Sequence, residues 1–267
     1  MPAISSSSNP RLKQARTLRQ RKVRDETGLF LVEGVFHVGE AAASGAGVEY
    51  ILYAPDLLTS DFAHELVRQQ SDSGVPCYAT TPQTFSSLAG KDNPQGIIAV
   101  VRQRPTPLAD LSPQNFNWGV ALVAPQDPGN VGAILRTIDA IGASGLLLLE
   151  GGVDPYHPTA VRASMGSLFW HPIARATFAD FALWAKENKY HVYGSSAHGN
   201  VDYRAVTAYA HPLILLMGSE REGLSQEQAE TCEQLIRLPM RGHVTSLNLA
   251  VVAGVMLYAM EEKLQGR

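Results

Sequence analysis

Residues 119–137 read GVALVAPQDPGNVGAILRT, and along this stretch a strand pattern gives way to a helix pattern. The apolar run over 119–124 is typical of a buried β-strand. After a polar turn that contains Gly129, apolar residues recur at the spacing of one helix face: Val131, Ile134, Leu135, Ile138 and Ile141. A strand that enters a helix through such a turn is the repeating unit of an α/β fold.

The second half of the chain repeats this alternation. Further strand candidates are 145–149, 190–195, 213–217 and 235–238, with helical periodicity between them. Alternating strands and helices predict a parallel sheet with helices on both faces. The last helix is expected after Thr245, with a core face of Leu249, Val252, Val255, Met256 and Met260.

The first half has a different and smaller pattern. Short apolar runs at 30–32, 50–53 and 97–101 alternate with helix-like stretches around 35–43 and 61–73, which predicts a small α/β unit. The prolines within 102–113 favour extended backbone. We therefore expect a domain at 1–103, a linker at 104–117 and a second domain at 118–267.

Composition indicates a folded globular protein. Of 267 residues, 45% are hydrophobic and 18% are charged, which is far from the profile of a disordered chain. No apolar run approaches the roughly 20 residues that cross a bilayer, and residues 1–5 lack a signal-peptide pattern, so a cytoplasmic protein without a membrane partner is expected. The two cysteines and eight histidines lack metal-ligand spacing, so no metal site is expected.

Charge is unevenly distributed. The net charge is −3, yet seven basic residues precede the first acidic residue, Asp25. They flank Leu12, Ala15 and Leu18, whose spacing predicts a short amphipathic helix that acts as a cationic arm. The alternative is an ordinary solvated helix face. The candidate RNA-binding residues are Arg11, Lys13, Arg16, Arg19, Arg21, Lys22 and Arg24.

Several common enzyme patterns are absent from the sequence. It contains no GxxxxGK(S/T) phosphate loop, no GxGxxG after a strand and no GxSxG nucleophile elbow. Nucleotide hydrolysis, dinucleotide binding and serine-hydrolase chemistry therefore lose their best support.

The segment 125–137, where a strand ends and a helix begins, is the first candidate site, because ligands in α/β folds bind where strands end. Gly129 and Gly132 allow close backbone approach, and Asn130 is expected to cap the helix. Arg136, nearly two turns further on, could share a helix edge with Asn130. The alternatives are an ordinary strand-to-helix turn and a surface arginine.

Two later segments are also candidates. Strand 213–217 ends in a glycine-containing polar loop over 218–225, in which Glu220 can accept hydrogen bonds from a ligand or from the loop itself. Ser246 and Asn248 precede an apolar helix. Capping suits Thr245 or Ser246 better than Asn248, whose amide is expected to lie inside the first turns and to need a partner.

Together and in this order, these three segments resemble the signature motifs of the SpoU (TrmH-like) branch of the SPOUT methyltransferases. The resemblance covers residues 119–262, and RASMGS at 162–167 matches a further segment. NPRLK at 9–13 and FLVEG at 30–34 resemble the start of an accessory RNA-binding domain similar to ribosomal protein L30e.

The resemblance implies an α/β catalytic domain with a parallel sheet and a deep trefoil knot, a homodimer, and S-adenosyl-L-methionine as cofactor. It implies methylation of a ribose 2′-hydroxyl. By resemblance, the catalytic or structural polar set is Asn130, Arg136, Glu220, Ser246 and Asn248. The implied cofactor-binding residues are Met217, Gly218, Glu220, Ile236, Leu238, Ser246, Leu247 and Asn248.

Arg136 matches the family residue thought to act on the ribose hydroxyl. A guanidinium is normally protonated, so we favour a role in binding the target phosphate and stabilising the developing alkoxide, with action as a base as the alternative.

The two-domain layout resembles the ribosomal-RNA enzymes of the family more than the shorter transfer-RNA type. Ribosomal RNA is therefore the expected substrate, with transfer RNA as the alternative. A catalytically inactive RNA-binding relative, an enzyme that methylates a base nitrogen and an unrelated α/β enzyme are the remaining alternatives. The complete polar set argues against the inactive relative, and the basic N-terminal segment argues against the unrelated enzyme.

Overall fold

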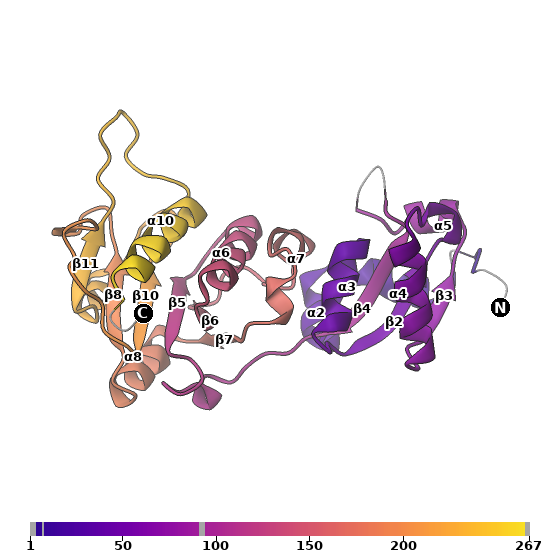
Figure 1. Cartoon of the computed structure of the whole chain (residues 1–267), viewed down its shortest axis with the longest axis horizontal. Helices are drawn as coiled ribbons and strands as arrows, with labels where there is room; N and C mark the ends of the chain where they lie inside the picture. The colour runs from indigo at the N-terminus through magenta and orange to yellow at the C-terminus, as the bar shows by residue number, and fades with distance from the viewer. Residues whose placement is uncertain (1–3, 7, 91–93, 265–267) are drawn as a thin grey trace. The chain divides into compact units, whose positions relative to one another are not determined.

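The structure is a computed structural model that describes residues 4–6, 8–90 and 94–264 (Figure 1). The chain forms two compact units. The first consists of Met1–Gln103 and Tyr156–Trp170, and the second of Arg104–Pro155 and His171–Arg267. The expected boundary after residue 103 falls where the units divide, but the sequence did not indicate that 156–170 belongs with the first unit.

The first unit is built on a four-stranded sheet in the order β1-β4-β2-β3. β4 pairs antiparallel with β1 and with β2, whereas β3 pairs parallel with β2. The strands are β1 (Leu29–Glu33), β2 (Val48–Tyr53), β3 (Cys77–Ala79) and β4 (Ile97–Arg102). The helices are α1 (Pro10–Thr17), α2 (Arg21–Thr27), α3 (Val35–Ala43), α4 (Asp61–Asp72), α5 (Pro82–Ser86) and α7 (Pro158–Ala163), with short 3₁₀ turns η1 (Pro55–Leu57) and η3 (Ser167–Phe169).

The basic N-terminal segment is part of this unit and not an arm. Leu12, Ala15 and Leu18 have no exposed surface and pack in one core cluster with residues of β1, β2 and β4. The helical spacing was therefore predicted correctly. The arm was wrong because the apolar face of α1 is buried against the sheet, which leaves only its polar side in solvent.

Arg24 corrects the predicted set of RNA-binding residues. Only 1% of its surface is exposed, and its Nη1 donates hydrogen bonds to the carbonyl oxygens of Leu18 (2.9 Å) and Arg19 (2.8 Å). These bonds tie α2 to the turn that follows α1. Arg24 is therefore a structural residue of the unit, and a deletion of residues 1–24 would remove core residues along with positive charge.

We expect Arg24→Met to lower the free energy of unfolding of the first unit by about 1.5–3 kcal/mol, because the buried carbonyl group of Leu18 and the partly buried one of Arg19 lose a charged donor. Arg21→Met is the matched control. The Arg21 side chain is 50% exposed and forms a surface ion pair with Asp25, so its loss should change stability little. Urea denaturation of both variants measures the difference, and equal stability would contradict a structural role for Arg24.

The second unit contains a seven-stranded sheet in the order β7-β6-β5-β10-β8-β11-β9. All its strand pairs are parallel, which confirms the predicted architecture. The strands are β5 (Trp118–Val123), β6 (Gly145–Leu149), β7 (Ile173–Ala176), β8 (His191–Ser195), β9 (Val201–Asp202), β10 (Leu213–Met217) and β11 (Gln234–Arg237). The helices are α6 (Pro128–Ile141), α8 (Phe178–Glu187), α9 (Gln226–Glu230) and α10 (Leu249–Glu262), with a 3₁₀ turn η2 (Leu108–Asp110).

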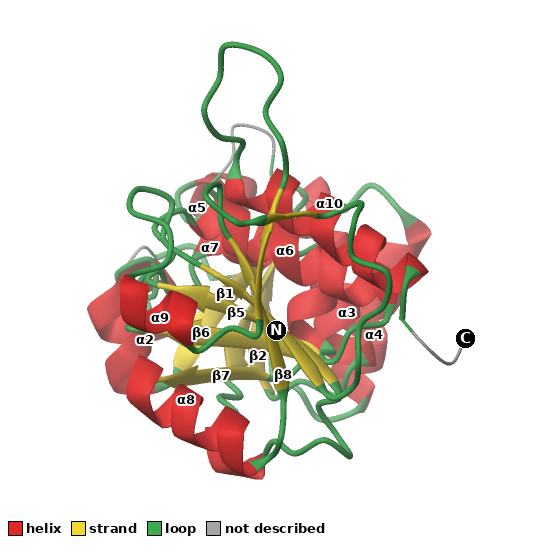
Figure 2. Cartoon of the chain, turned by 90° about the vertical axis from the view of Figure 1, so that its left-hand side faces the viewer, coloured by secondary structure: helices red, strands yellow, loops and turns green. Residues whose placement is uncertain are grey.

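Helices cover both faces of this sheet (Figure 2). α6 and α10 pack together on one face, and α8 packs on the other against alternate residues of β5 and β10. The predicted face of α6 is fully in the core. On α10, Val255 was expected in the core but is 37% exposed. α10 is apolar on more than one side, so periodicity did not show which side the core would take.

Residues 104–117 were predicted as a linker, but part of the segment belongs to the core of the second unit. Leu111 and Phe116 are buried in the cluster beneath α8. The Phe116 ring also explains a glycine in β5, because a Cβ on Gly119 would lie 2.1 Å from the ring. No helix in the described ranges is long and apolar enough to cross a bilayer.

Candidate active site

The candidate site lies at the carboxyl edge of the parallel sheet. Across four neighbouring strands, Leu122, Met217, Ser195 and Ile236 stand in register as one row. Met217 and Ile236 were predicted to bind cofactor, and the row places them on either side of Ser195. Ligands in open parallel sheets bind outside this edge, because the loops that leave the strands surround it.

Glu220 connects the loop after β10 to the turn after β5. Its carboxylate accepts hydrogen bonds from the backbone N–H of Gln126 at 3.1 Å and of Asp127 at 3.4 Å, and from Nδ2 of Asn130 at 3.3 Å. Charge-assisted bonds of this kind hold backbone segments more firmly than neutral ones. The first and second candidate segments are therefore fixed against each other.

Asn130 extends the connection to the third segment. The Asn130 side chain is 7% exposed, and its Oδ1 accepts a hydrogen bond from Nδ2 of Asn248 at 2.8 Å. The amide of Asn130 is thus satisfied at both ends, as a buried polar group requires. The sequence of contacts Glu220–Asn130–Asn248, which we call the polar chain, joins three segments that are far apart in the sequence.

The helix caps differ from the prediction. Asp127, not Asn130, caps α6, because its Oδ1 accepts from the Gly129 N–H at 2.7 Å and Pro128 occupies the first helical position. Asn248, not Thr245 or Ser246, caps α10 through bonds from the N–H groups of Ala250 and Val251. Asn130 is therefore free of a capping role and available to the polar chain.

The loop over 238–248 projects from the rest of the unit between β11 and α10 (Figures 1 and 2). Val244 and Leu247 are 60% and 42% exposed on it, and Ser246 is exposed as well. The predicted cofactor residues are therefore divided. Met217, Gly218 and Ile236 are buried at the sheet edge, whereas Ser246 and Leu247 lie on the projecting loop.

Gly218 allows the loop after β10 to fold back on itself. Ser219 and Gly223 exchange two backbone hydrogen bonds of 3.1 and 3.0 Å. A Cβ on Gly218 would lie 2.0 Å from the carbonyl carbon of Gly223. No rotamer change relieves this contact, because a Cβ is fixed by its own backbone and the carbon that it meets is a backbone atom. Only glycine fits here, and the fold-back carries Glu220 between its two ends.

Comparison with known proteins places this arrangement in a family. Residues 117–258 match the SpoU rRNA Methylase family, and residues 9–99 match the MRM3-like substrate binding domain. The chain belongs to the SpoU rRNA methylase family. The resemblance seen in the three segments is thereby confirmed.

Several members of the SpoU family resemble the chain over nearly its full length. It is 32% identical to a 23S rRNA (uridine(2479)-2′-O)-methyltransferase of Streptomyces viridochromogenes, over 98% of this chain and 93% of that protein. It is 29% identical to a 23S rRNA (guanosine(2553)-2′-O)-methyltransferase of Bacillus subtilis, over 97% and 98%. An AdoMet-bound rRNA methyltransferase from Sinorhizobium meliloti is 37% identical, with a TM-score of 0.87 over 97% and 96% of the two chains.

Two members of the predicted SpoU polar set lie outside the polar chain. Arg136 is exposed on α6, and Ser246 is exposed on the projecting loop. Within the described ranges, neither side chain makes a hydrogen bond or ion pair with another residue. Arg136 is exposed and makes no hydrogen bond with Asn130, which is buried. Arg136 therefore presents a guanidinium to solvent from the helix that begins at the candidate site.

Ser195 and the backbone amides of Gln126 and Asp127 were not among the predicted site residues. Ser195 ends β8 in the row between Met217 and Ile236. A signal was available, since 190–195 was itself a predicted strand and the ends of parallel strands share one edge. The amides carried no signal, because backbone donors have no side-chain signature in a sequence.

Most of the predicted RNA-binding side chains lie on α1 and α2 and have local partners. Arg11 lies 5.0 Å from the centre of the Tyr50 ring, and Nη2 of Arg16 donates to Oγ of Ser87 at 2.9 Å. Lys22 pairs at 3.8 Å with Glu26 but is 83% exposed. These contacts orient the cations on the surface of the first unit. Among the described residues, no group of three His, Cys, Asp or Glu side chains is arranged to hold a metal ion.

Proposed function

We propose that this protein transfers a methyl group from S-adenosyl-L-methionine to a ribose 2′-hydroxyl of ribosomal RNA. The polar chain Glu220–Asn130–Asn248 is the observation that carries the proposal, because it assembles the three family segments at the sheet edge. Membership of the SpoU family and the names of the full-length relatives, two of which are 23S rRNA 2′-O-methyltransferases, support the substrate class.

The residues at the sheet edge fit this cofactor. An adenosyl group needs apolar cover for its ring and backbone groups at its edge. The side chains of Met217 and Ile236 are buried, so these strand ends can offer backbone groups, and the exposed side chain of Leu247 can offer apolar cover. When bound, S-adenosyl-L-methionine supplies an activated methyl group on a positively charged sulfur.

The task of the protein is to align the ribose oxygen and to lower the cost of its developing negative charge. Arg136 suits this task, because a permanently charged guanidinium can bind the phosphate next to the target ribose and stabilise the alkoxide. The polar chain holds the turn from which α6 begins, and α6 carries Arg136. Positioning and electrostatic stabilisation, more than proton abstraction by a side chain, are therefore the main contributions of these residues.

The substrate class is tested by transfer of labelled methyl groups. Unmodified transcripts of 23S and 16S ribosomal RNA and a pool of transfer RNA are each incubated with the protein and labelled cofactor. Label in 23S RNA alone is the expected result. Label in transfer RNA alone would replace ribosomal RNA as the substrate. Cofactor binding without label in any pool would favour an RNA-binding protein without transfer activity.

A homodimer is the second part of the proposal, and it rests on α10. Val251, Val255 and Tyr258 are 50%, 37% and 57% exposed at the spacing of one helix face. The opposite side of α10 packs against α6. A second copy that covers this apolar face would remove it from water and would place α6 and α10 of each copy near the interface.

The cytoplasmic location expected from the sequence also remains part of the proposal.

We expect Val255→Glu to convert the dimer to a monomer, because an unpaired charge at the centre of an apolar interface is strongly disfavoured. Leu183→Glu is the matched control, since Leu183 on α8 is an apolar residue that is 57% exposed. Light scattering with size-exclusion chromatography gives the masses. A monomer in the unchanged protein, or a dimer in both variants, would contradict an interface on α10.

A further inference from the structure

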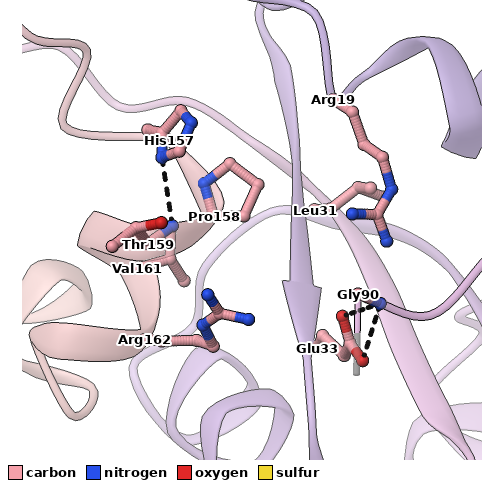
Figure 3. A pocket seen from close by; sticks show the side chains of 9 residues that line it. All are labelled: Arg19, Leu31, Glu33, Gly90, His157, Pro158, Thr159, Val161 and Arg162. Carbon is pink, nitrogen blue, oxygen red and sulfur yellow. Dashed lines mark hydrogen bonds between the residues drawn. The ribbon is translucent and has the colours of Figure 1, made fainter. Parts of the chain in front are cut away.

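The first unit contains a cavity of about 200 Å³ that the active-site account does not use (Figure 3). It lies between α7 and the sheet strand β1. Its principal lining side chains are Arg19, Leu31, Glu33, His157, Val161 and Arg162, and we call it the Arg19–Arg162 cavity. Contacts on either side of it fix α7 in the unit: Tyr156 packs on Phe30 at 4.8 Å, and Nε2 of His37 lies 3.3 Å from the carbonyl oxygen of Arg162.

Three sequence segments that stood out meet in this cavity. Arg162 begins the RASMGS segment, Glu33 belongs to FLVEG, and Arg19 belongs to the basic N-terminal segment. None of the three residues contributes to the polar chain. All three segments therefore contribute a side chain to the lining of this one cavity.

Two guanidinium groups give the cavity its positive charge. Within the described ranges, the Arg162 guanidinium makes no hydrogen bond or ion pair, and it points into the space between α7 and β1 (Figure 3). Arg19 donates from Nη2 to the carbonyl oxygen of Leu88. A guanidinium has five N–H donors, so this bond orients Arg19 and leaves donors for a ligand. Paired arginines are typical of phosphate recognition.

Glu33 indicates that the ligand carries more than a phosphate. Both oxygens of Glu33 lie near the Gly90 N–H, at 3.0 and 3.3 Å, and a carboxylate has further lone pairs. A carboxylate would repel a bare phosphate, whereas it accepts hydrogen bonds from ribose hydroxyls or base amines. Nδ1 of His157 accepts from the Thr159 N–H at 3.2 Å, which orients the imidazole ring at the start of α7.

The remaining walls are apolar. Leu31 and Val161 are 8% and 1% exposed, and Pro158 lies beside them. Such surfaces contact the face of a base or the carbons of a ribose. The volume is below the roughly 300–1,000 Å³ of pockets that enclose drug-sized ligands. The cavity therefore suits a single small unit with one anionic end.

We propose that the Arg19–Arg162 cavity binds one nucleotide of the RNA substrate. Arg19 and Arg162 take its phosphate, Glu33 accepts from its hydroxyl or amine groups, and Leu31 and Val161 contact its ribose or base. This assignment of the cavity rests on the proposed function in one respect, which is that RNA is the polymer that supplies the nucleotide. A single-stranded or flipped-out nucleotide is required, because a paired base cannot enter a cavity of this kind.

The direct test uses the full-length protein and single nucleotides. Each of the four ribonucleoside 5′-monophosphates is titrated into ¹⁵N-labelled protein and followed by NMR, with S-adenosylhomocysteine at saturating concentration so that the cofactor pocket is filled. At least one nucleotide should bind more tightly than inorganic phosphate. Arg162→Gln should lower the affinity for that nucleotide about tenfold or more, as expected for loss of a charged contact.

Arg68→Gln is the matched control, because it removes the same charge from α4 of the same unit, where Arg68 is paired with Glu65 and Asp72. It should leave nucleotide affinity unchanged. Arg162→Lys should retain part of the affinity, which separates loss of charge from loss of folding. Equal affinity of Arg162→Gln and Arg68→Gln, or nucleotide binding no tighter than inorganic phosphate, would overturn the proposal.

A second readout uses ribosomal RNA and separates this proposal from the proposed function. Arg162→Gln should raise KM for 23S RNA about tenfold while kcat changes little, and it should lower the dependence of RNA affinity on salt, because one phosphate contact is lost. An unchanged KM and salt dependence would count against the cavity as an RNA site. If the unchanged protein methylates no RNA but nucleotides still bind as described, the proposed function fails and the cavity assignment stands.

Discussion

Arg136→Ala should lower methyl transfer by about 10²–10³-fold, the usual effect of losing one group that stabilises charge in a transition state. The affinity for S-adenosyl-L-methionine should be unchanged, because Arg136 is exposed on α6 and takes no part in the polar chain. Arg136→Lys should recover only part of the activity, since lysine keeps the charge but loses the planar pair of donors. Single-turnover kinetics with saturating cofactor measure the loss, and calorimetry measures cofactor affinity.

Two further variants define what this result means. Lys186→Ala removes an exposed cation from α8 of the same unit and should retain full activity. Asn248→Ala should instead weaken cofactor binding. It removes the hydrogen bond to Asn130 and the side chain that caps α10. Equal losses of stability and of cofactor affinity in Arg136→Ala and Asn248→Ala would contradict the assignment of Arg136 to the RNA and of Asn248 to the cofactor pocket.

Gly218→Ala should abolish cofactor binding and should lower the temperature at which the second unit unfolds. The added Cβ would lie 2.0 Å from the carbonyl carbon and 2.4 Å from the next backbone nitrogen of the returning loop, at Gly223 and Leu224. Backbone atoms cannot rotate away as a side chain can, so the fold-back has to open. Glu220, which the fold-back carries, would then lose its bonds to the turn after β5.

Gly242→Ala is the matched control for this prediction. A Cβ at Gly242 meets no heavy atom within 4 Å, so the same added methyl group should leave the unfolding temperature unchanged. Thermal unfolding followed by circular dichroism gives the stabilities, and equilibrium dialysis gives cofactor binding. Native stability and native cofactor affinity in Gly218→Ala would show that the loop does not need its fold-back.

The sequence predicted the parts of the fold that depend on long apolar runs. The strand candidates 145–149 and 213–217 match β6 and β10 at both ends, because buried parallel strands are apolar throughout. The shorter strands β3, β7 and β9, of three, four and two residues, were missed. Their pairing depends on register with neighbouring strands, which no local pattern contains.

Side-chain roles were harder to predict than elements. Arg24 lies in a run of cations that is typical of a solvated surface, yet it is buried because it donates to the carbonyl groups of Leu18 and Arg19 at the turn after α1. Asn248 was assigned to the interior of a helix that begins only at Leu249. Helix starts shift by a few residues when several polar residues precede the apolar run, and the competing cap decides the start.

The candidate site itself could be predicted in outline. The residues Asn130, Glu220 and Asn248 were named from their segments, and the structure joins them by hydrogen bonds. What the sequence could not give is the order of these contacts or the row that brings Ser195 between Met217 and Ile236. Both follow from the strand order, which is a property of the whole sheet.

The position of the transferred methyl group tests the central proposal most directly. Unmodified 23S RNA is methylated with labelled cofactor, one portion is hydrolysed by alkali, and another is digested to nucleosides for mass spectrometry. We expect the label in an alkali-stable dinucleotide and in a 2′-O-methyl nucleoside, because a methylated 2′-oxygen cannot attack the neighbouring phosphate. Label on a base, with all linkages at labelled nucleotides cleaved by alkali, would contradict ribose methylation.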